Sequence, residues 1–284
     1  MLGRVLKVEP NVYKVRADDG KTFKCIAKGS VKFSKNKPMV GDLVNLNEDW
    51  AIDKIYPRKN EFIRPPIVNV DQIIMVMSTT NPKPDLTLLD KQLVMAEKIG
   101  VDILICINKI DLNDDCDEII DVYERVGYQV ITTDAKNGLG VDKLAVLLKG
   151  KVTAFTGNSG VGKSALTNNI FKEVISEEGM ISDKTLKGKH TTKYVELFEI
   201  APDTFIADTP GFSSYDVKGI SYKDLDNYFI EFSSYMDKCE YRGCSHVKEL
   251  SCGVKRAVDA ERIDKGRYER YCELYQKLKE EKQW

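Results

Sequence analysis

The stretch GNSGVGKS, residues 157–164, matches the pattern GxxxxGK[ST] of a phosphate-binding loop. It follows the apolar run KVTAFT and precedes the helical sequence SALTNNIF, which is the strand, loop and helix context that the pattern requires. Backbone N–H groups of such a loop surround phosphates, while Lys163 reaches the β and γ phosphates and Ser164 can ligate Mg²⁺. We therefore predict a phosphate site with a catalytic Lys163, formed by Gly157, Asn158, Ser159, Gly160, Val161, Gly162, Lys163, Ser164 and Ala165.

A second phosphate-sensing segment is expected in IADTPGF, residues 206–212. Asp208 would end a strand and hold the magnesium shell, and Gly211 would give its N–H to a γ phosphate. Taken alone, Asp-Thr-Pro-Gly is also a favourable turn. Its position after the phosphate loop and at a strand end favours the nucleotide function. Thr191 or Thr192 would close over Mg²⁺, and we favour Thr192.

A base-reading motif is present in NKID, residues 108–111, which comes before the phosphate loop in the chain. Asp111 can accept hydrogen bonds from the ring N–H and the exocyclic amine of guanine, while Lys109 covers the ring and Asn108 braces the loop. A site built on such pairing rejects the wrong base by roughly 10⁴, because its carboxylate would be left unpaired. In the later TTDAKNG, we expect the N–H of Ala135 to contact the base and Lys136 to flank it.

These motifs lie in a segment, residues 67–214, that alternates continuous apolar runs with helical sequence. The runs QIIMVMS, DILICIN, YQVITT, KVTAFTG and TFIAD are typical of buried parallel strands. Apolar residues at Leu86, Leu89, Leu93 and Ala96 predict a helix between two of them. We therefore expect an α/β doubly wound sheet whose motif order is circularly permuted, which the nearby ends of a compact domain allow.

The first 66 residues predict a small β-barrel. Short alternating stretches about ten residues apart suggest about five strands, the OB-fold pattern. This segment carries fourteen Lys/Arg against eight Asp/Glu, although the whole chain has a formal net charge of −1. The barrel is accordingly the RNA-binding candidate, and a barrel that only packs on its neighbour is the alternative. Two adjacent prolines in RPPIVNVDQ predict extended backbone at its boundary.

The last segment, residues 215–284, predicts an α-helical module that binds zinc. Its final helix should pack through a stripe of Tyr268, Tyr271, Leu274, Tyr275 and Leu278, and a partner-binding face is the alternative. Three thiolates and one imidazole form the ligand set of a closed structural Zn²⁺ site, although reduced core cysteines stay possible from the residues alone. The four ligand candidates are Cys239, Cys244, His246 and Cys252; the other cysteines, Cys25, Cys106, Cys116 and Cys272, are expected to be ordinary thiols.

Composition excludes several classes of protein. The near-zero net charge excludes a uniformly basic nucleic-acid binder, and no apolar run suits a signal peptide or a membrane span. Seven cysteines, an odd number, fit reduced thiols or a metal site better than a disulfide framework. We therefore expect a cytoplasmic protein that does not contact membranes. We also expect a monomer, although composition does not bear on oligomeric state.

The motif order, with a barrel before it, resembles the ribosome small-subunit-dependent GTPase family of circularly permuted GTPases. The resemblance rests on RPPIVNVDQ, NKID, GNSGVGKS, KGKHTT, DTPGF and the cysteine and histidine cluster, and it spans essentially the whole chain. It implies zinc at the cluster, GTP or GDP with Mg²⁺ in the nucleotide site, and the small ribosomal subunit and its rRNA as partners. One departure is Asp134, where the family usually has serine, and it bears on the detail of the base loop.

The residue that orients the attacking water does not follow from the usual motif. Many GTP hydrolases use a glutamine after the DxxG motif, but Phe212 stands at that position. The family pattern suggests His190 instead, with hydrolysis in late subunit maturation stimulated by the small subunit. A loop histidine that contacts RNA or solvent is the alternative for His190. For the whole chain, an RNA-binding scaffold with negligible turnover and a P-loop ATPase are the competing functions.

Overall fold

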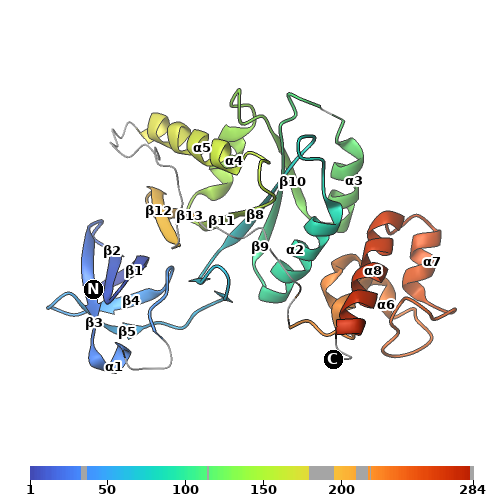
Figure 1. Cartoon of the computed structure of the whole chain (residues 1–284), viewed down its shortest axis with the longest axis horizontal. Helices are drawn as coiled ribbons and strands as arrows, with labels where there is room; N and C mark the ends of the chain where they lie inside the picture. The colour runs from blue at the N-terminus through green and yellow to red at the C-terminus, as the bar shows by residue number, and fades with distance from the viewer. Residues whose placement is uncertain (33–36, 114, 179–194, 209–216, 218, 282–284) are drawn as a thin grey trace.

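The computed structural model describes residues 1–32, 37–113, 115–178, 195–208, 217 and 219–281. Three parts follow one another along the chain: a barrel, a central α/β part and a helical module (Figure 1). The barrel and the helical module lie on opposite sides of the central part (Figure 1). Across the described ranges, no helix combines the length and the apolar character needed to cross a bilayer.

The N-terminal part is a closed barrel of five strands, as the alternating sequence predicted. Strand β1 pairs with both β2 and β4, which closes the barrel, and β3 pairs with β5 in parallel. Inward-facing side chains of Val5, Val15, Val44 and Ile52 are fully buried. The elements are β1 Leu2–Glu9, β2 Val12–Ala17, β3 Thr22–Ala27, α1 Gly29–Lys32, β4 Leu43–Leu46 and β5 Ala51–Ile55.

The two adjacent prolines lie in a turn, whereas extended backbone was expected there, so that expectation was wrong. They connect β6 (Glu61–Phe62) to β7 (Ile67–Val68), which form an antiparallel pair. The Arg64–Pro65 peptide bond is cis, a geometry that proline permits in a tight turn. The pair packs back on the barrel, because the Val68 N–H donates to the Val40 carbonyl at 2.9 Å.

The central sheet contains five parallel strands in the order β10-β9-β8-β11-β13, with β12 antiparallel at the end. All residues of β8 and β11 are buried, as their continuous apolar sequences predicted. Helices cover both faces: α2 and α3 contribute to one core cluster, and α4 and α5 contribute to the other. The elements are β8 Gln72–Ser78, α2 Leu86–Ile99, β9 Asp102–Asn108, α3 Asp117–Val126, β10 Gln129–Thr133, α4 Val141–Leu148, β11 Val152–Thr156, α5 Lys163–Glu178, β12 Glu196–Ala201 and β13 Thr204–Asp208.

Helix α2 begins and ends with clear capping interactions. The Asp85 side chain accepts the Leu88 N–H at 2.9 Å, which satisfies one free donor of the first turn. Gly100 ends the helix in the left-handed conformation with φ of 69°. Leu89 and Leu93 face the sheet and are buried, which confirms the helix predicted from their spacing.

The barrel and the central sheet share hydrogen bonds, so that one continuous sheet of 11 strands runs through both. The contact is the antiparallel pair of β1 with β12, where Lys7 lies opposite Glu196. Glu196 also forms ion pairs with Lys7 at 3.3 Å and Lys14 at 3.1 Å, and Arg16 contacts Glu199 at 2.6 Å. Basic residues of the barrel therefore form ion pairs with the two glutamates of β12.

The C-terminal part is helical and packs on the outer face of α2. Its last helix buries Tyr271, Leu274, Tyr275 and Leu278 in a core that also contains Val94 of α2, which confirms the predicted packing stripe. The elements are the 3₁₀ helices η1 Leu225–Tyr228 and η2 Ile230–Phe232, and the α-helices α6 Ser233–Met236, α7 Gly253–Asp259 and α8 Lys265–Glu281.

A buried ion-pair network joins this module to the central part. The guanidinium of Arg267 is fully buried and donates to Asp90 of α2 at 2.5 Å and to Glu231 of η2 at 2.6 Å. Asp90 also accepts from Tyr123 of α3 at 2.7 Å and from Arg270 at 2.5 Å. The charges are therefore paired and hydrogen-bonded, as buried charges must be.

Candidate functional site

The predicted nucleotide loops meet along one edge of the central sheet, the edge formed by the carboxyl ends of its parallel strands. Strands β9, β10, β11 and β13 are parallel within the sheet, so that their carboxyl ends lie on the same side. The chain passes from the outer strand β10 through α4 to β11, which lies beside β8, so the winding direction reverses between β8 and β11. Such a reversal is the usual ligand position in doubly wound sheets, and the phosphate loop follows β11 at that point.

The phosphate loop has the backbone that its glycines allow. Gly157 has φ of 136°, and a Cβ atom there would lie 2.0 Å from the Val76 carbonyl oxygen. The Lys163 ammonium reaches across the loop and donates to the carbonyls of Gly157 at 2.7 Å and Asn158 at 2.8 Å. Burial lowers the pKa of Lys163. Helix α5 begins at this lysine, so that its N-terminus faces the loop.

Asn108 joins the base-reading motif to two other loops. Its amide donates to the Val161 carbonyl of the phosphate loop at 2.9 Å. Its Oδ1 accepts the Ala135 N–H at 3.0 Å and the Thr133 hydroxyl at 3.1 Å. A Cβ atom at Gly162 would lie 2.2 Å from the Asn108 amide nitrogen, so only glycine fits this approach. The structure thus brings together three loops that the sequence separates.

The rest of the base-reading motif lies at the surface beside the segment that follows β8. Lys109 has φ of 67° and donates through its ammonium to the Asn81 carbonyl at 2.5 Å. The Thr79 hydroxyl donates to the Lys109 carbonyl at 2.9 Å. The side chain of Asp111 is exposed, and Lys136 is exposed on the neighbouring loop. Both are therefore accessible to a ligand at this edge.

Asp134, where the family usually has serine, forms hydrogen bonds within the second base loop, which is the TTDAKNG segment at residues 132–138. Its Oδ1 accepts the N–H groups of Lys136 at 2.9 Å and Asn137 at 3.1 Å. Burial opposes the charge, but the side chain and N–H of Asn137 and the N–H of Lys136 bring the pKa of Asp134 below its ordinary value. The aspartate therefore serves as a turn-forming acceptor, which is a common use of this side chain.

The phosphate-sensing residues lie largely outside the described residues. His190, Thr192 and Gly211 fall there, together with Phe212. Asp208 ends β13 at the same edge as the phosphate loop, and Ser164 is exposed in the first turn of α5. Both residues therefore lie on the same side of the sheet as the phosphate loop, and their contact with Mg²⁺ stays a prediction.

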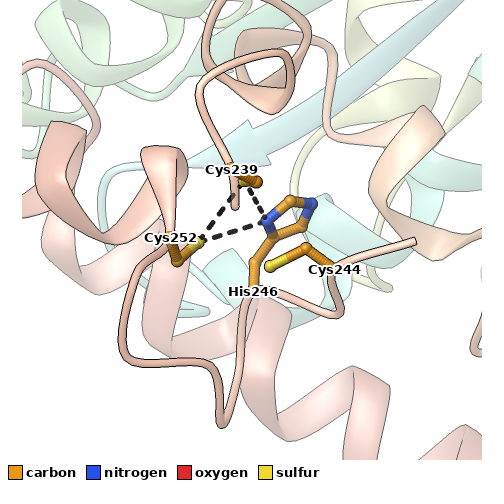
Figure 2. A group of neighbouring side chains, drawn as sticks. All are labelled: Cys239, Cys244, His246 and Cys252. Atoms are coloured by element: carbon orange, nitrogen blue, oxygen red, sulfur yellow. Dashed lines mark hydrogen bonds between the residues drawn. The ribbon is translucent and has the colours of Figure 1, made fainter. Parts of the chain in front are cut away.

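A candidate metal centre lies in the helical module, where the four predicted ligands converge (Figure 2). Their ligand atoms all lie within 4.8 Å of one another. The sulfurs of Cys239 and Cys252 are 3.9 Å apart, close to the roughly 3.8 Å expected for two thiolates bound tetrahedrally to one zinc ion. The Nδ1 atom of His246 lies 3.6 Å from Cys239 and 3.3 Å from Cys252 (Figure 2). Together with Cys244, this group could hold a metal ion.

The surroundings of the cluster suit a cation. Nε2 of His246 points away from the sulfurs and lies 3.5 Å from a carboxylate oxygen of Asp226, an orientation common among metal-bound histidines. Burial raises the pKa of the Cys244 thiol to about 12. For Cys239, burial also opposes the thiolate, but the N–H groups of Gly253 and Val254 lower the pKa. Three thiols so close together would favour a metal over separate burial as apolar groups.

Two polar contacts near the phosphate loop were missed by the sequence analysis. Gln92 of α2 donates to the Thr156 hydroxyl, at the end of β11, at 3.2 Å. Asn169 of α5 donates to the Ala135 carbonyl of the second base loop. A polar residue on the sheet-facing side of an otherwise apolar helix was the available signal for Gln92. No local pattern singled out Asn169.

The fold and the site define a class, the circularly permuted P-loop GTPases. The model of the RsgA GTPase family matches residues 55–218. The chain is 39% identical to the small ribosomal subunit biogenesis GTPase RsgA of Alkaliphilus metalliredigens, over 99% of each chain. Another relative, the protein of that name in Ruminiclostridium cellulolyticum, is also 39% identical, over 98% of this chain and 94% of that protein.

Solved structures agree with these relatives. YjeQ from Thermotoga maritima superimposes with a TM-score of 0.86 at 33% identity, covering 98% of both chains. YloQ, described as a circularly permuted GTPase, has a TM-score of 0.82 at 31% identity and covers 99% of this chain and 95% of its own. The chain belongs to the RsgA GTPase family. It is therefore a GTP hydrolase, which favours hydrolysis over the scaffold and ATPase alternatives.

Proposed function

We propose that this GTPase acts in the biogenesis of the small ribosomal subunit, in late maturation, and that the subunit stimulates its hydrolysis of GTP to GDP. The observation that carries this proposal is the full-length similarity to relatives named for that role. It extends over the barrel and the helical module and not only over the nucleotide part. The partners would be GTP or GDP and the subunit with its rRNA, and we propose a cytoplasmic monomer that needs no membrane.

The nucleotide would lie along the sheet edge, with guanine at the base loops and phosphates at the phosphate loop. Asp111 would pair with the guanine edge, and Lys109 and Lys136 would flank the ring. When the phosphates bind, Lys163 would exchange its contacts with the Gly157 and Asn158 carbonyls for contacts with phosphate oxygens. Mg²⁺ would be held by Ser164, Thr192 and Asp208, and it would neutralise charge on the phosphates.

His190 remains our proposed water-positioning residue, since Phe212 cannot orient water. We expect His190→Ala to lower the turnover number with saturating small subunits while GDP affinity stays unchanged. An unchanged turnover number would remove His190 from the mechanism and would favour a loop histidine that contacts RNA or solvent. We further propose that hydrolysis weakens binding to the subunit, because the segment after DTPGF leads directly into the helical module. Equal subunit affinity with GDP and with a non-hydrolysable GTP analogue would refute this second point.

The cysteine and histidine cluster would hold a structural Zn²⁺ ion. Four protein ligands leave no position for a catalytic water, so the ion would stabilise the module and take no part in hydrolysis. The separations of the sulfur and nitrogen atoms support this assignment. Measurement of bound zinc in the purified protein tests it, with one zinc per chain expected.

We propose the barrel as the RNA-binding part. The proposed domains remain residues 1–66, 67–214 and 215–284. Phe23 and Trp50 stack with ring centroids 3.8 Å apart, and Trp50 keeps 40% of its surface exposed. Nearby Ile26 is 60% exposed, an apolar position beside the basic Lys24 on the same strand. Barrels that hold single-stranded RNA commonly combine exposed aromatic rings, on which bases stack, with basic side chains that contact the backbone, and this barrel carries both kinds of residue. Packing on β12 occupies another side of the barrel, so the two uses are compatible.

The proposed function is tested by GTP hydrolysis of the purified protein, alone and with small ribosomal subunits. Large subunits and ATP are the controls for partner and nucleotide. We expect stimulation by small subunits only, and no comparable hydrolysis of ATP. Tight GTP binding without stimulation would refute the proposed partner and leave the GTPase assignment in place.

A further inference from the structure

Asn169 lies on the helix of the phosphate loop, at the boundary with the second base loop. On α5, Leu166 and Ile170 are fully buried in the same core cluster as Ala135. Residues three and four apart share one face of a helix, so Asn169 lies beside this packed face. It is half-buried there, and the packing of its neighbours limits the movement of its backbone.

The Asn169 amide donates to the carbonyl oxygen of Ala135. The N–H of Ala135 donates to Asn108 Oδ1 at 3.0 Å, so both backbone polar groups of this residue are held by asparagine side chains. Asn108 in turn donates to the Val161 carbonyl of the phosphate loop at 2.9 Å. The contacts form a closed ring that runs from the phosphate loop through Asn108 and Ala135 to α5 and back along the chain.

We propose that Asn169 is a positioning residue of guanine-nucleotide binding, which ties the second base loop to the helix that carries Lys163. The proposal deepens the proposed function and rests on guanine nucleotides binding at this edge. Asn169 need not touch the nucleotide. It sets the distance between the loop that contacts the base and the loop that contacts the phosphates, so that one ligand meets both loops in the correct geometry.

The role has a specific kinetic consequence. A loop that loses one of its anchors must be ordered when the ligand binds, and this ordering costs free energy. One hydrogen bond of this kind corresponds to about a three- to tenfold change in affinity. The loss should occur mainly as faster nucleotide release, since affinity changes within one site are mostly changes in dissociation rate. The turnover number at saturating GTP should change little, because the phosphate loop keeps its own contacts.

The chain offers a matched control one residue away. Asn168 is the same residue type on the same helix, and its side chain is exposed. Asn168→Ala and Asn169→Ala therefore change helix propensity equally, and only the second removes the contact with Ala135. Asn169→Asp keeps the size of the side chain but replaces the donor with an acceptor, which would face the Ala135 carbonyl and repel it.

The experiment is stopped-flow release of a fluorescent GDP analogue from the full-length protein, with KM and turnover number for GTP measured in parallel. We expect release about three- to tenfold faster in Asn169→Ala, at least as fast in Asn169→Asp, and unchanged in Asn168→Ala. A higher KM with an unchanged turnover number would support positioning. Equal release rates in the two alanine variants would overturn the inference, as would a fall in turnover number alone. Failure of the wild-type protein to bind GDP would instead overturn the nucleotide site itself.

Discussion

Replacing Arg267 with methionine tests how the helical module is attached to the nucleotide part. Methionine keeps much of the apolar length of arginine and removes its charge. Arg267 is fully buried and contacts Asp90, Glu231 and the ring of Phe229, whose centroid lies 4.8 Å from the guanidinium carbon. The substitution therefore removes one cation from a site that keeps two carboxylates.

The two carboxylates are affected unequally. Asp90 keeps Tyr123 and Arg270 as hydrogen-bond donors, whereas Glu231 loses both of its contacts with Arg267. The Glu231 side chain is only 9% exposed, so its charge would be buried without compensation. Breaking a buried pair in this way costs about 3–5 kcal/mol, and we expect the free energy of unfolding to fall by about 4 kcal/mol.

Arg270→Met is the matched control, since Arg270 makes one contact with Asp90 and its side chain is 15% exposed. We expect it to cost about 2 kcal/mol, the range for a single hydrogen bond to a charged group. Adding Glu231→Gln to Arg267→Met should restore part of the lost stability, because it removes the uncompensated charge. By itself, Glu231→Gln should destabilise the protein. The pair of residues is therefore expected to be strongly non-additive.

The assay is urea unfolding of the zinc-loaded protein, followed by circular dichroism and by zinc release. Both signals should shift to lower urea in Arg267→Met, because α8 and α2 would separate first. A loss below about 0.5 kcal/mol would refute the reasoning, since it would mean that the desolvation of these charges cancels their attraction. Additive effects in the double variant would refute the assignment of the cost to Glu231.

Three further predictions concern the nucleotide and metal sites. Gly162→Ala should abolish GDP binding measured by calorimetry, because the new Cβ would lie 2.2 Å from the Asn108 amide; retained affinity would refute that steric argument. Asp111→Asn should change the preferred base from guanine to xanthine, because the asparagine amide can donate to the C2 carbonyl that xanthine has in place of the guanine amine. Competition binding with guanine and xanthine nucleotides checks it. Zinc binding should release protons, because burial raises the pKa of Cys244 to about 12 and the thiol is protonated at neutral pH without metal. Zinc affinity should therefore fall as the pH is lowered from 8 to about 6, and a pH-independent affinity would contradict this.

Much of the nucleotide site could be predicted from the sequence, because each loop follows a buried strand directly. NKID and GNSGVGKS are local motifs whose chemistry depends on a few adjacent residues, and the parallel sheet then brings them together. The metal cluster was also predictable from local sequence, because its four ligand candidates lie within one short segment. The buried strands followed from their continuous apolar runs, and the packed face of α8 followed from helical periodicity.

Contacts between distant segments could not be predicted in this way. Arg267 and Asp90 are 177 residues apart, and no local pattern indicates that these two charged residues pair with each other. Pairing of β1 with β12 depends on edge strands from two different parts of the chain, whose register no local pattern specifies. The paired prolines were misjudged because extended backbone is their common conformation, whereas the hairpin partner strands made a tight turn here.

The shared sheet has a consequence for any attempt to study the nucleotide part by itself. A chain that began at residue 67 would lack β1, and β12 would become a bare edge with unsatisfied backbone groups. Glu196 and Glu199 would discourage self-association there, but the strand would no longer be held by basic residues of the barrel. A shortened protein of this kind should therefore be judged by its oligomeric state before its activity is compared with that of the full chain.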